Sequence, residues 1–164
     1  MKRIFIDADK CDGCMNCTLA CMNAHRKDGE ENIYTLDLGG AESENRCFIL
    51  LGANKSYRPL FCRHCDVPDC AGACMSGALY KNMENGLVEY DEDKCAACYM
   101  CVMSCRYGVP AISPDRKRMI KCDFCVHLEE GPACVRACPK KAIEVREVYG
   151  KWSVTSSSAP ALRA

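Results

Sequence analysis

The chain has 164 residues, the length of one ordinary domain or two very small ones, and its 22 basic side chains balance its 22 acidic ones. Seventeen residues are cysteine, which leaves two broad classes, a disulfide scaffold or a metal protein. A disulfide scaffold needs an oxidising compartment, but only the short apolar run 4–6 precedes Asp7, which is too little for a signal peptide. We therefore expect reduced cysteines and a cytoplasmic location.

The same numbers exclude further classes. No stretch approaches the roughly 18 consecutive apolar residues of a transmembrane helix, so we expect no direct membrane insertion. Phosphate binding needs a basic face, and the formal net charge is zero, so we expect no nucleic-acid partner. A catalytic role is not expected either, because there is no nucleophile–base pair and no nucleotide loop beyond Gly39–Gly40.

In chain order, residues 3–7 predict a short strand that leads into a first group of cysteines. The phrase Ile6-Asp-Ala-Asp-Lys-Cys11 is matched later by Tyr90-Asp-Glu-Asp-Lys-Cys95. Agreement outside the cysteines indicates an internal repeat, which a coincidence of spacing would not produce.

The intervals between cysteine groups predict β-hairpins. The longest interval, residues 22–61, contains the strand-like segments 33–38 and 47–51 on either side of Gly39–Gly40. We interpret these segments as a hairpin inserted into the first repeat. Residues 75–94 predict two short strands around a turn.

Residues 106–121 predict a further hairpin whose tip carries the basic run Arg116-Lys-Arg118. We expect this run to be solvated, although it could also dock a partner. From Ser153 onward the composition changes to Ser, Ala and Pro, with little to bury. Residues 153–164 are therefore expected to form a flexible tail.

Sixteen of the cysteines fall into four groups. The first and third have the spacing C-x2-C-x2-C-x3-C, the bacterial-type iron–sulfur pattern in which the fourth cysteine serves the other cluster of a pair. The second and fourth groups are looser versions of it. In order, the groups are Cys11, Cys14, Cys17 and Cys21; Cys62, Cys65, Cys70 and Cys74; Cys95, Cys98, Cys101 and Cys105; and Cys122, Cys125, Cys134 and Cys138. They predict four [4Fe–4S] clusters.

The chemistry of a cubane cluster explains this spacing. Each of its four irons needs one more soft ligand, which thiolate supplies. Three closely spaced cysteines can wrap three corners of one cube, whereas the fourth corner faces away from that loop. Helical turns expected at residues 102–104 and 135–137 would carry the fourth thiol away from its own cluster. Zinc is an alternative for groups two and four, since two cysteine pairs can form a tetrahedral site.

Four cysteine groups in this order resemble the four-cluster electron-transfer subunits of anaerobic oxidoreductases. That family includes the iron–sulfur subunits of dimethyl-sulfoxide reductase-type enzymes, formate dehydrogenases and formate-linked hydrogenases. The phrases Phe5-Ile-Asp-Ala-Asp-Lys-Cys-Asp-Gly-Cys14, Phe61-Cys-Arg-His-Cys65 and Cys74-Met-Ser-Gly-Ala78 are most similar to the CooF-like ferredoxins that partner carbon monoxide dehydrogenase. The resemblance covers residues 3–148.

The resemblance implies an α+β fold of two pseudo-symmetric bacterial ferredoxin-like di-cluster modules, nested and with inserted β-hairpins. The outer module would be split between residues 1–55 and 106–150, and the inner module would be residues 56–105. Group one would face group four, and group two would face group three. Spacing alone leaves a tandem pairing open, with group one facing group two and group three facing group four.

Carried over by position, the resemblance also implies the ligands of each cluster. Cluster 1 would be held by Cys11, Cys14, Cys17 and Cys138; cluster 2 by Cys122, Cys125, Cys134 and Cys21; cluster 3 by Cys62, Cys65, Cys70 and Cys105; and cluster 4 by Cys95, Cys98, Cys101 and Cys74.

Cys47 is left over, and its apolar neighbours predict a buried structural role. His25, His64 and His127 are expected at the surface or beside a cluster, because sixteen cysteines already saturate four clusters. Arg63 and His64 lie inside a cysteine loop, where charge and hydrogen bonds to sulfur could tune a cluster potential.

The chain has little conventional apolar core for its length, and 27% of its residues are charged. The clusters would therefore be the core, and their binding free energy would be largely folding free energy, so we expect the apoprotein to be mostly unfolded. At about −2 each, four clusters would give the holoprotein a charge of about −8.

A cluster with four thiolates has no open iron, so four clusters in one chain imply a relay of single electrons. We expect an electron-transfer subunit that serves a carbon monoxide dehydrogenase, hydrogenase, formate dehydrogenase or aldehyde oxidoreductase, with a second redox protein or flavoprotein at its other end. A free-standing polyferredoxin shuttle and a zinc-stabilised interaction module are the alternatives. The neutral charge and the long insertion at 22–61 favour the subunit over the shuttle.

Overall fold

The computed structural model describes residues 1–28, 30, 32–38 and 44–148. The described strands form antiparallel two-stranded sheets. The pairs are β1 (Lys2–Ile6) with β8 (Ile143–Glu147), β2 (Phe48–Leu51) with β3 (Tyr57–Leu60), β4 (Leu79–Lys81) with β5 (Val88–Tyr90), and β6 (Ala111–Ile112) with β7 (Met119–Ile120). The α-helices are α1 (Asn16–Ala24), α2 (Asp69–Gly72), α3 (Met100–Ser104) and α4 (Ala133–Arg136). Short 3-10 helices are η1 (Ala8–Lys10), η2 (Ile33–Thr35), η3 (Ala53–Lys55) and η4 (Glu92–Lys94). This mixture confirms the predicted α+β class. Among the described residues, no helix combines the length and apolar character needed to cross a membrane.

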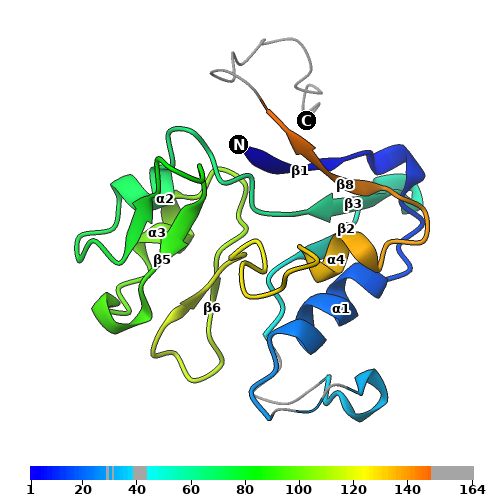
Figure 1. Cartoon of the computed structure of the whole chain (residues 1–164), viewed down its shortest axis with the longest axis horizontal. Helices are drawn as coiled ribbons and strands as arrows, with labels where there is room; N and C mark the ends of the chain where they lie inside the picture. The colour runs from blue at the N-terminus through cyan, green and yellow to red at the C-terminus, as the bar shows by residue number, and fades with distance from the viewer. Residues whose placement is uncertain (29, 31, 39–43, 149–164) are drawn as a thin grey trace.

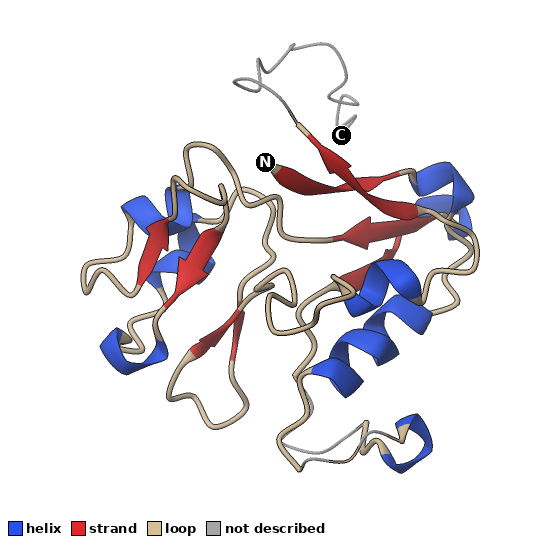
Figure 2. Ribbon diagram, viewed as in Figure 1, coloured by secondary structure: helices blue, strands red, loops and turns tan. Residues whose placement is uncertain are grey.

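The elements gather in two groups, each containing one pair of packed helices (Figure 1). In one group α1 packs against α4, next to the strands β1, β8, β2 and β3. In the other α2 packs against α3, next to β4 and β5. The small β6–β7 hairpin lies between the two groups (Figure 2). Each helix pair therefore joins an early part of the chain to a later one.

The predicted first strand is confirmed as β1, and its partner β8 lies near the far end of the described chain. Ile4 pairs with Val145 and Ile6 with Ile143. Ile4 and Ile143 are both buried, so this two-stranded sheet turns one apolar face inward. That face belongs to a core formed by Ile4, Cys17, Cys21, Cys47, Phe61, Leu87, Phe124, Cys134 and Ile143. A second, smaller core consists of Leu79, Val88, Cys101 and Met119.

The internal repeat is also present in the backbone hydrogen bonds. The Asp7 amide donates to the Ala142 carbonyl over 2.8 Å, and the Asp91 amide donates to the Ala78 carbonyl over 2.8 Å. In both copies a 3-10 helix, η1 or η4, follows this bond and leads into the first cysteine of the group. The two similar phrases therefore adopt one local structure, and the repeat is confirmed.

Two of the predicted hairpins are confirmed within the described residues. The strands β4 and β5 flank the predicted turn of residues 82–86, where the Gly86 amide donates to the Asn82 carbonyl. The strands β6 and β7 flank the predicted tip at residues 113–118.

The prediction of a strand at 33–38 is wrong, because residues 33–35 form the 3-10 helix η2. The Asn32 side chain accepts a hydrogen bond from the Tyr34 amide and so caps this turn. The Arg26 guanidinium binds the Asn32 carbonyl at 3.0 Å, and it thereby occupies an acceptor that a strand partner would need. The segment 47–51 does contain a strand, β2, but its partner is β3. The predicted Gly39–Gly40 turn and the predicted tail 153–164 lie outside the described residues.

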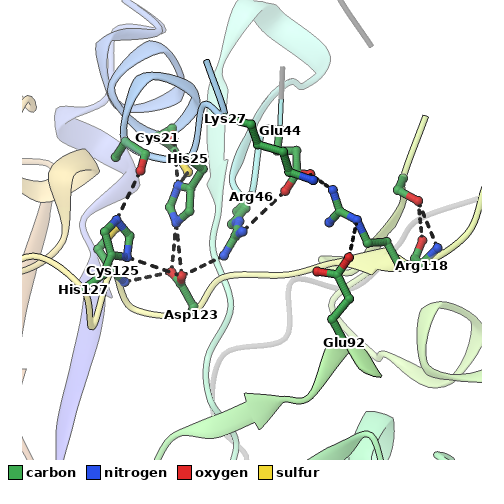
Figure 3. Close-up of polar contacts among 12 residues, drawn as sticks. Cys21, His25, Lys27, Glu44, Arg46, Glu92, Arg118, Asp123, Cys125 and His127 are labelled. Atoms are coloured by element: carbon green, nitrogen blue, oxygen red, sulfur yellow. Dashed lines mark hydrogen bonds and ion pairs between the residues drawn. The ribbon is translucent and has the colours of Figure 1, made fainter. Parts of the chain in front are cut away.

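The prediction that the whole basic run at 116–118 is solvated is also wrong. Arg116 and Lys117 are exposed, but Arg118 is only 9% exposed. Its guanidinium pairs with the buried Glu44 carboxylate and lies 2.9 Å from a Glu92 carboxylate oxygen (Figure 3). A buried carboxylate needs a cationic partner, and Arg118 reaches it from the position just before β7.

Candidate iron–sulfur centres

The thiols of the first cysteine group converge on one cavity. Cys11, Cys14 and Cys17 line it together with Cys138 from the end of the chain, and Ile49 and Phe61 are among its apolar walls. Cys14 is exposed, whereas Cys17 is buried. The first three cysteines of group one and the last cysteine of group four thus face the same space.

A second cavity has the same composition. It is lined by Cys95, Cys98 and Cys101 of group three and by Cys74, the last cysteine of group two. Cys98 is exposed, in the position that corresponds to Cys14 in the first group. Leu79, Tyr90 and Met119 are among the other lining residues.

The remaining eight predicted ligands line neither of these two cavities, and they differ in burial. Cys21, Cys122, Cys125 and Cys134 are all buried. Burial raises the pKa of the Cys134 thiol, and the neighbouring thiols of Cys122, Cys21 and Cys125 raise it further. The four thiols are thus shielded from solvent by burial, and they act on one another electrostatically.

Cys62, Cys65, Cys70 and Cys105, the predicted ligands of cluster 3, are all half-buried. Burial raises the pKa of the Cys70 thiol to about 11, and Cys62 and Cys105 add to that rise. Cys62 also contributes to the raised pKa of Cys122, after burial, so this set lies next to the preceding one.

The turn between the first two cysteines has the same unusual backbone in all four groups. The residue just before the second cysteine has a positive φ: 75° at Gly13, 43° at His64, 50° at Ala97 and 64° at Phe124. Only the first of these is glycine, and a left-handed conformation costs other residues about 1–2 kcal/mol. Strain that recurs at four equivalent turns indicates a functional requirement on the loop.

Gly13→Ala should destabilise the loaded protein by about 2 kcal/mol. A Cβ at this position would collide with the Tyr57 ring, and the positive φ adds strain of its own. Anaerobic urea denaturation, followed by visible absorbance, measures the loss. Ala97→Gly, at the equivalent turn of group three, is the matched control and should change stability by less than about 1 kcal/mol. Equal losses in the two variants would contradict this explanation.

Backbone amides already point at several of the sulfur atoms. The Leu79 amide donates to Cys74 Sγ and the Ala142 amide to Cys138 Sγ, each over 3.3 Å. These two thiols are equivalent in the repeat, since each is the fourth cysteine of its group. The Phe124 amide donates to Cys122 Sγ over 3.3 Å. Such bonds favour thiolate over thiol.

The donor sets fit [4Fe–4S] clusters. Each of the two cavities offers four sulfur ligands from two separated parts of the chain and has apolar walls. The raised pKa values of buried thiols such as Cys122 and Cys134 mean that the thiolates need a compensating positive charge. Iron supplies that charge when a cluster binds.

Cys47 belongs to none of the four sets. It is 2% exposed, and its Sγ lies 3.7 Å from the Cys17 carbonyl oxygen in the first core. Hydrogen bonding with the Cys17 and Cys21 thiols, together with burial, raises its pKa, so it remains a neutral thiol. The predicted buried position is confirmed.

A histidine–carboxylate network beside Cys21 and Cys125 was missed at the level of sequence (Figure 3). His25 Nδ1 lies 2.7 Å from the Cys21 carbonyl oxygen, and His25 Nε2 lies 3.0 Å from Asp123 Oδ1. Arg46 Nη1 lies 2.8 Å from Asp123 Oδ2. Burial lowers the pKa of His25, but the hydrogen bond with Asp123 and bonds with the two thiols outweigh it and raise the pKa above its usual value.

A short motif could have revealed part of this network. Asp12 and Asp123 both follow the first cysteine of their groups, and each carboxylate accepts a hydrogen bond from the amide of the second cysteine, Cys14 or Cys125. The C-D-x-C phrase therefore marks a turn in which aspartate braces the loop. The partners His25 and Arg46 lie far from it in sequence.

Two cavities that are each lined by four cysteines, on a small α+β scaffold with two further cysteine groups, define an iron–sulfur protein of the ferredoxin type. Residues 53–148 match the family model described as a 4Fe-4S dicluster domain. The chain is 37% identical over 169 residues to the probable anaerobic dimethyl sulfoxide reductase chain YnfG of Escherichia coli, covering 98% of this chain and 82% of that protein. It is 34% identical over 155 residues to the electron transport protein HydN of Escherichia coli, covering 85% of each chain.

Among solved structures, a chain of the active site complex BamBC of benzoyl coenzyme A reductase has a similar fold. The TM-score is 0.50 at 21% identity, and the match covers 98% of this chain and 83% of that one. Taken together, the matches place this protein in the family of [4Fe–4S] iron–sulfur subunits of anaerobic oxidoreductases. The predicted family is confirmed, and the closer resemblance to CooF-like ferredoxins stays a prediction.

Proposed function

We propose that this protein is an electron-transfer subunit that relays single electrons through four [4Fe–4S] clusters to or from a catalytic oxidoreductase. The observation that carries the proposal is that two cavities are each lined by four cysteines, three from one cysteine group and the fourth from another. A cluster with four thiolates exchanges electrons but has no open iron for a substrate. The chain's own residues would hold the clusters, exclude water and set the potentials.

The nested ligand sets are part of this proposal. The cavity that joins Cys138 to the first group and the cavity that joins Cys74 to the third group both support them. The packing of α1 on α4 and of α2 on α3 supports the same pairing, because each helix carries cysteines of its own group. A tandem pairing would instead join groups one and two, and groups three and four. The module boundaries at residues 1–55, 56–105 and 106–150 accompany the nested arrangement.

The exposure of the ligands suggests the ends of the relay. Cluster 1 would contain the exposed Cys14, and cluster 4 would contain the exposed Cys98. All four ligands of cluster 2 are buried, and Cys62 of cluster 3 acts on Cys122 of cluster 2. Electrons would therefore enter and leave at clusters 1 and 4 and cross between the modules from cluster 2 to cluster 3.

The partner would be a catalytic subunit, since two of the relatives are named as a reductase chain and an electron transport protein. A second redox protein or flavoprotein would exchange electrons at the other end. A reducing compartment such as the cytoplasm accompanies the proposal, because thiolate ligands must stay reduced. A free-standing polyferredoxin is the second candidate, favoured only by the exposure of a ligand at each end.

Metal analysis and co-purification should test the function together. The anaerobically purified chain should contain about sixteen iron and sixteen sulfide ions, four for each cluster. A few zinc ions without sulfide would overturn the cluster assignment in favour of an interaction module. Native extracts should elute the chain with a larger enzyme on size exclusion. Elution of the fully loaded chain by itself would favour the shuttle.

Cys105→Ser should release Cys62, Cys65 and Cys70 from iron and make them reactive towards alkylation, while the cysteines of the other ligand sets stay protected from it. The lost thiolate completes cluster 3 in the nested arrangement. Anaerobic alkylation followed by peptide mass spectrometry identifies which cysteines become reactive. Increased alkylation at Cys122 and Cys125, with Cys62 unchanged, would contradict nesting and favour the tandem pairing. Cys47→Ser is the matched control, and it should leave all four sets protected because Cys47 is a ligand in neither arrangement.

A further inference from the structure

A lysine precedes the first cysteine in three of the four groups, but these lysines have different surroundings. Lys10 and Lys94 have side chains 58% and 62% exposed. Each is paired with an aspartate three residues earlier, at 2.8 Å from Asp7 and 2.5 Å from Asp91. The third lysine, Lys121, is only 4% exposed. At this equivalent position, Lys10 and Lys94 form solvated ion pairs, whereas Lys121 is a buried cation.

A hydrogen bond from Asn85 and, to a smaller degree, the charge of Lys121 lower the pKa of the Glu89 carboxylate, but Lys121 makes no direct ion pair with it. Lys121 Nζ donates to the Val88 carbonyl oxygen and to the Cys122 carbonyl oxygen, the latter over 2.6 Å. No carboxylate among the residues that the structure describes forms an ion pair with it. A buried ammonium that binds only carbonyls is costly, so a counter-charge is expected nearby. Clusters with four thiolates carry about −2 each and can provide it.

Lys121 lies at the junction between the two helix groups. Its Nζ donates to the carbonyl of Cys122 in the loop of cluster 2 and to the carbonyl of Val88, whose amide donates to His64 Nδ1 in the loop of cluster 3. One ammonium therefore lies against the backbone that connects the two loops between which electrons would cross.

The neighbouring groups strengthen the positive character of this junction. Lys81 Nζ donates to the His64 and Cys65 carbonyls over 3.0 and 2.8 Å, within the loop of cluster 3. Lys81 and Arg3 share a single carboxylate, Asp66, at 3.9 and 3.0 Å. Two further cations of the junction thus share one described aspartate.

His64 is a second, independent observation at this junction, because it has a buried hydrogen-bond donor that no described protein atom accepts. It is 2% exposed, and its Nδ1 accepts the Val88 amide proton over 3.0 Å, which places the ring proton on Nε2. Nε2 has no hydrogen-bond partner among the described residues. The ring packs edge-on against Phe124 in the loop of cluster 2. A buried donor between two cluster loops normally has an acceptor, and cluster sulfur is one.

We propose that Lys121 raises the reduction potentials of clusters 2 and 3 above those of clusters 1 and 4. An electron in the relay is then most stable on clusters 2 and 3, at the junction of the two helix groups. Reduction adds one negative charge to a cluster, and a nearby buried cation stabilises that charge. The outer clusters face solvent and lysines already paired with aspartate, so they lack this contribution. The inference rests on the proposed function and on the nested ligand sets.

Potentiometric titration of the anaerobic, fully loaded chain, monitored by electron paramagnetic resonance, tests the proposal. In Lys121→Gln, the reduced-to-oxidised ratio of the two most easily reduced clusters at a fixed potential should fall about tenfold, which is 59 mV for a one-electron couple. Lys121→Arg keeps the charge and should restore the ratio to within about threefold. Lys94→Gln removes the solvated counterpart and should leave all four couples unchanged. Unshifted couples in Lys121→Gln, or an equal shift in Lys94→Gln, would overturn the proposal.

A second arm does not depend on whether Lys121 can be replaced. Cys70→Ser should alter one of the first two clusters to be reduced, whereas Cys98→Ser should alter one of the last two. The reverse order would overturn the proposal. Failure of the function itself is distinguishable, because the unaltered chain would then show fewer than four couples or too little iron. If the chain shows four redox couples whose reduction potentials do not change in Lys121→Gln, only the present inference is refuted.

Discussion

Removal of iron from the loaded protein is expected to unfold most of the chain. The described sheets each have only two strands, and such hairpins are marginal in isolation. The two cores are small, and cysteines of the proposed ligand sets account for several of their members, including Cys17, Cys21 and Cys101. Without the clusters, nothing holds the paired loops around their cavities. Far-UV circular dichroism and amide hydrogen exchange during anaerobic chelation measure the loss.

The expected result is a joint loss of visible absorbance and of amide protection in β1, β8 and α1. Reconstitution with iron and sulfide should restore both and release protons, because the thiols of the unfolded chain are largely protonated at neutral pH and must ionise to bind iron. Cys47→Ala is the control that separates packing from ligation, since Cys47 lies in the same core without a ligand role. It should retain all four clusters. An iron-free chain with native amide protection would show that the scaffold folds by itself.

Arg118→Met is expected to lower the free energy of unfolding by about 3 kcal/mol, because it leaves a buried carboxylate without its main partner. Glu44 is 2% exposed, and its other cations are Arg46 at 3.4 Å and the exposed Lys27 at 3.6 Å. Arg118 also pairs with Glu92, so it ties the segment around Glu44 to η4, just ahead of group three. Both connections are lost together in the variant.

Urea-induced bleaching of the loaded protein under anaerobic conditions measures this effect. Arg136→Met is the matched control, because the Arg136–Glu130 pair is exposed and should contribute less than about 1 kcal/mol. The double variant Arg118→Met with Glu44→Gln should lose less than the sum of the single losses, since the unpaired charge is gone. Additive losses would mean that the two side chains do not act as a pair.

The sequence alone determined the cofactor and the family. Sixteen cysteines at cluster spacing restrict the ligand chemistry, because thiolates at four corners suit a cubane and two equal spacings reveal the repeat. The strand β1, the hairpins β4–β5 and β6–β7 and the burial of Cys47 were also predictable. The strand and the hairpins depend on local pattern and turn chemistry, which short-range interactions decide, whereas the burial of Cys47 was indicated only by its apolar neighbours in sequence.

Only the tertiary structure decided which distant groups meet. The strand predicted at 33–38 became the helix η2 because Arg26 and Asn32 occupy its hydrogen-bonding groups. Arg118 is buried because Glu44, more than seventy residues away, needs a cation. The sequence shows three equivalent lysines before cysteines, yet only Lys121 is buried. Burial is a property of the assembled chain, and it converts a common surface residue into an unscreened charge beside the clusters.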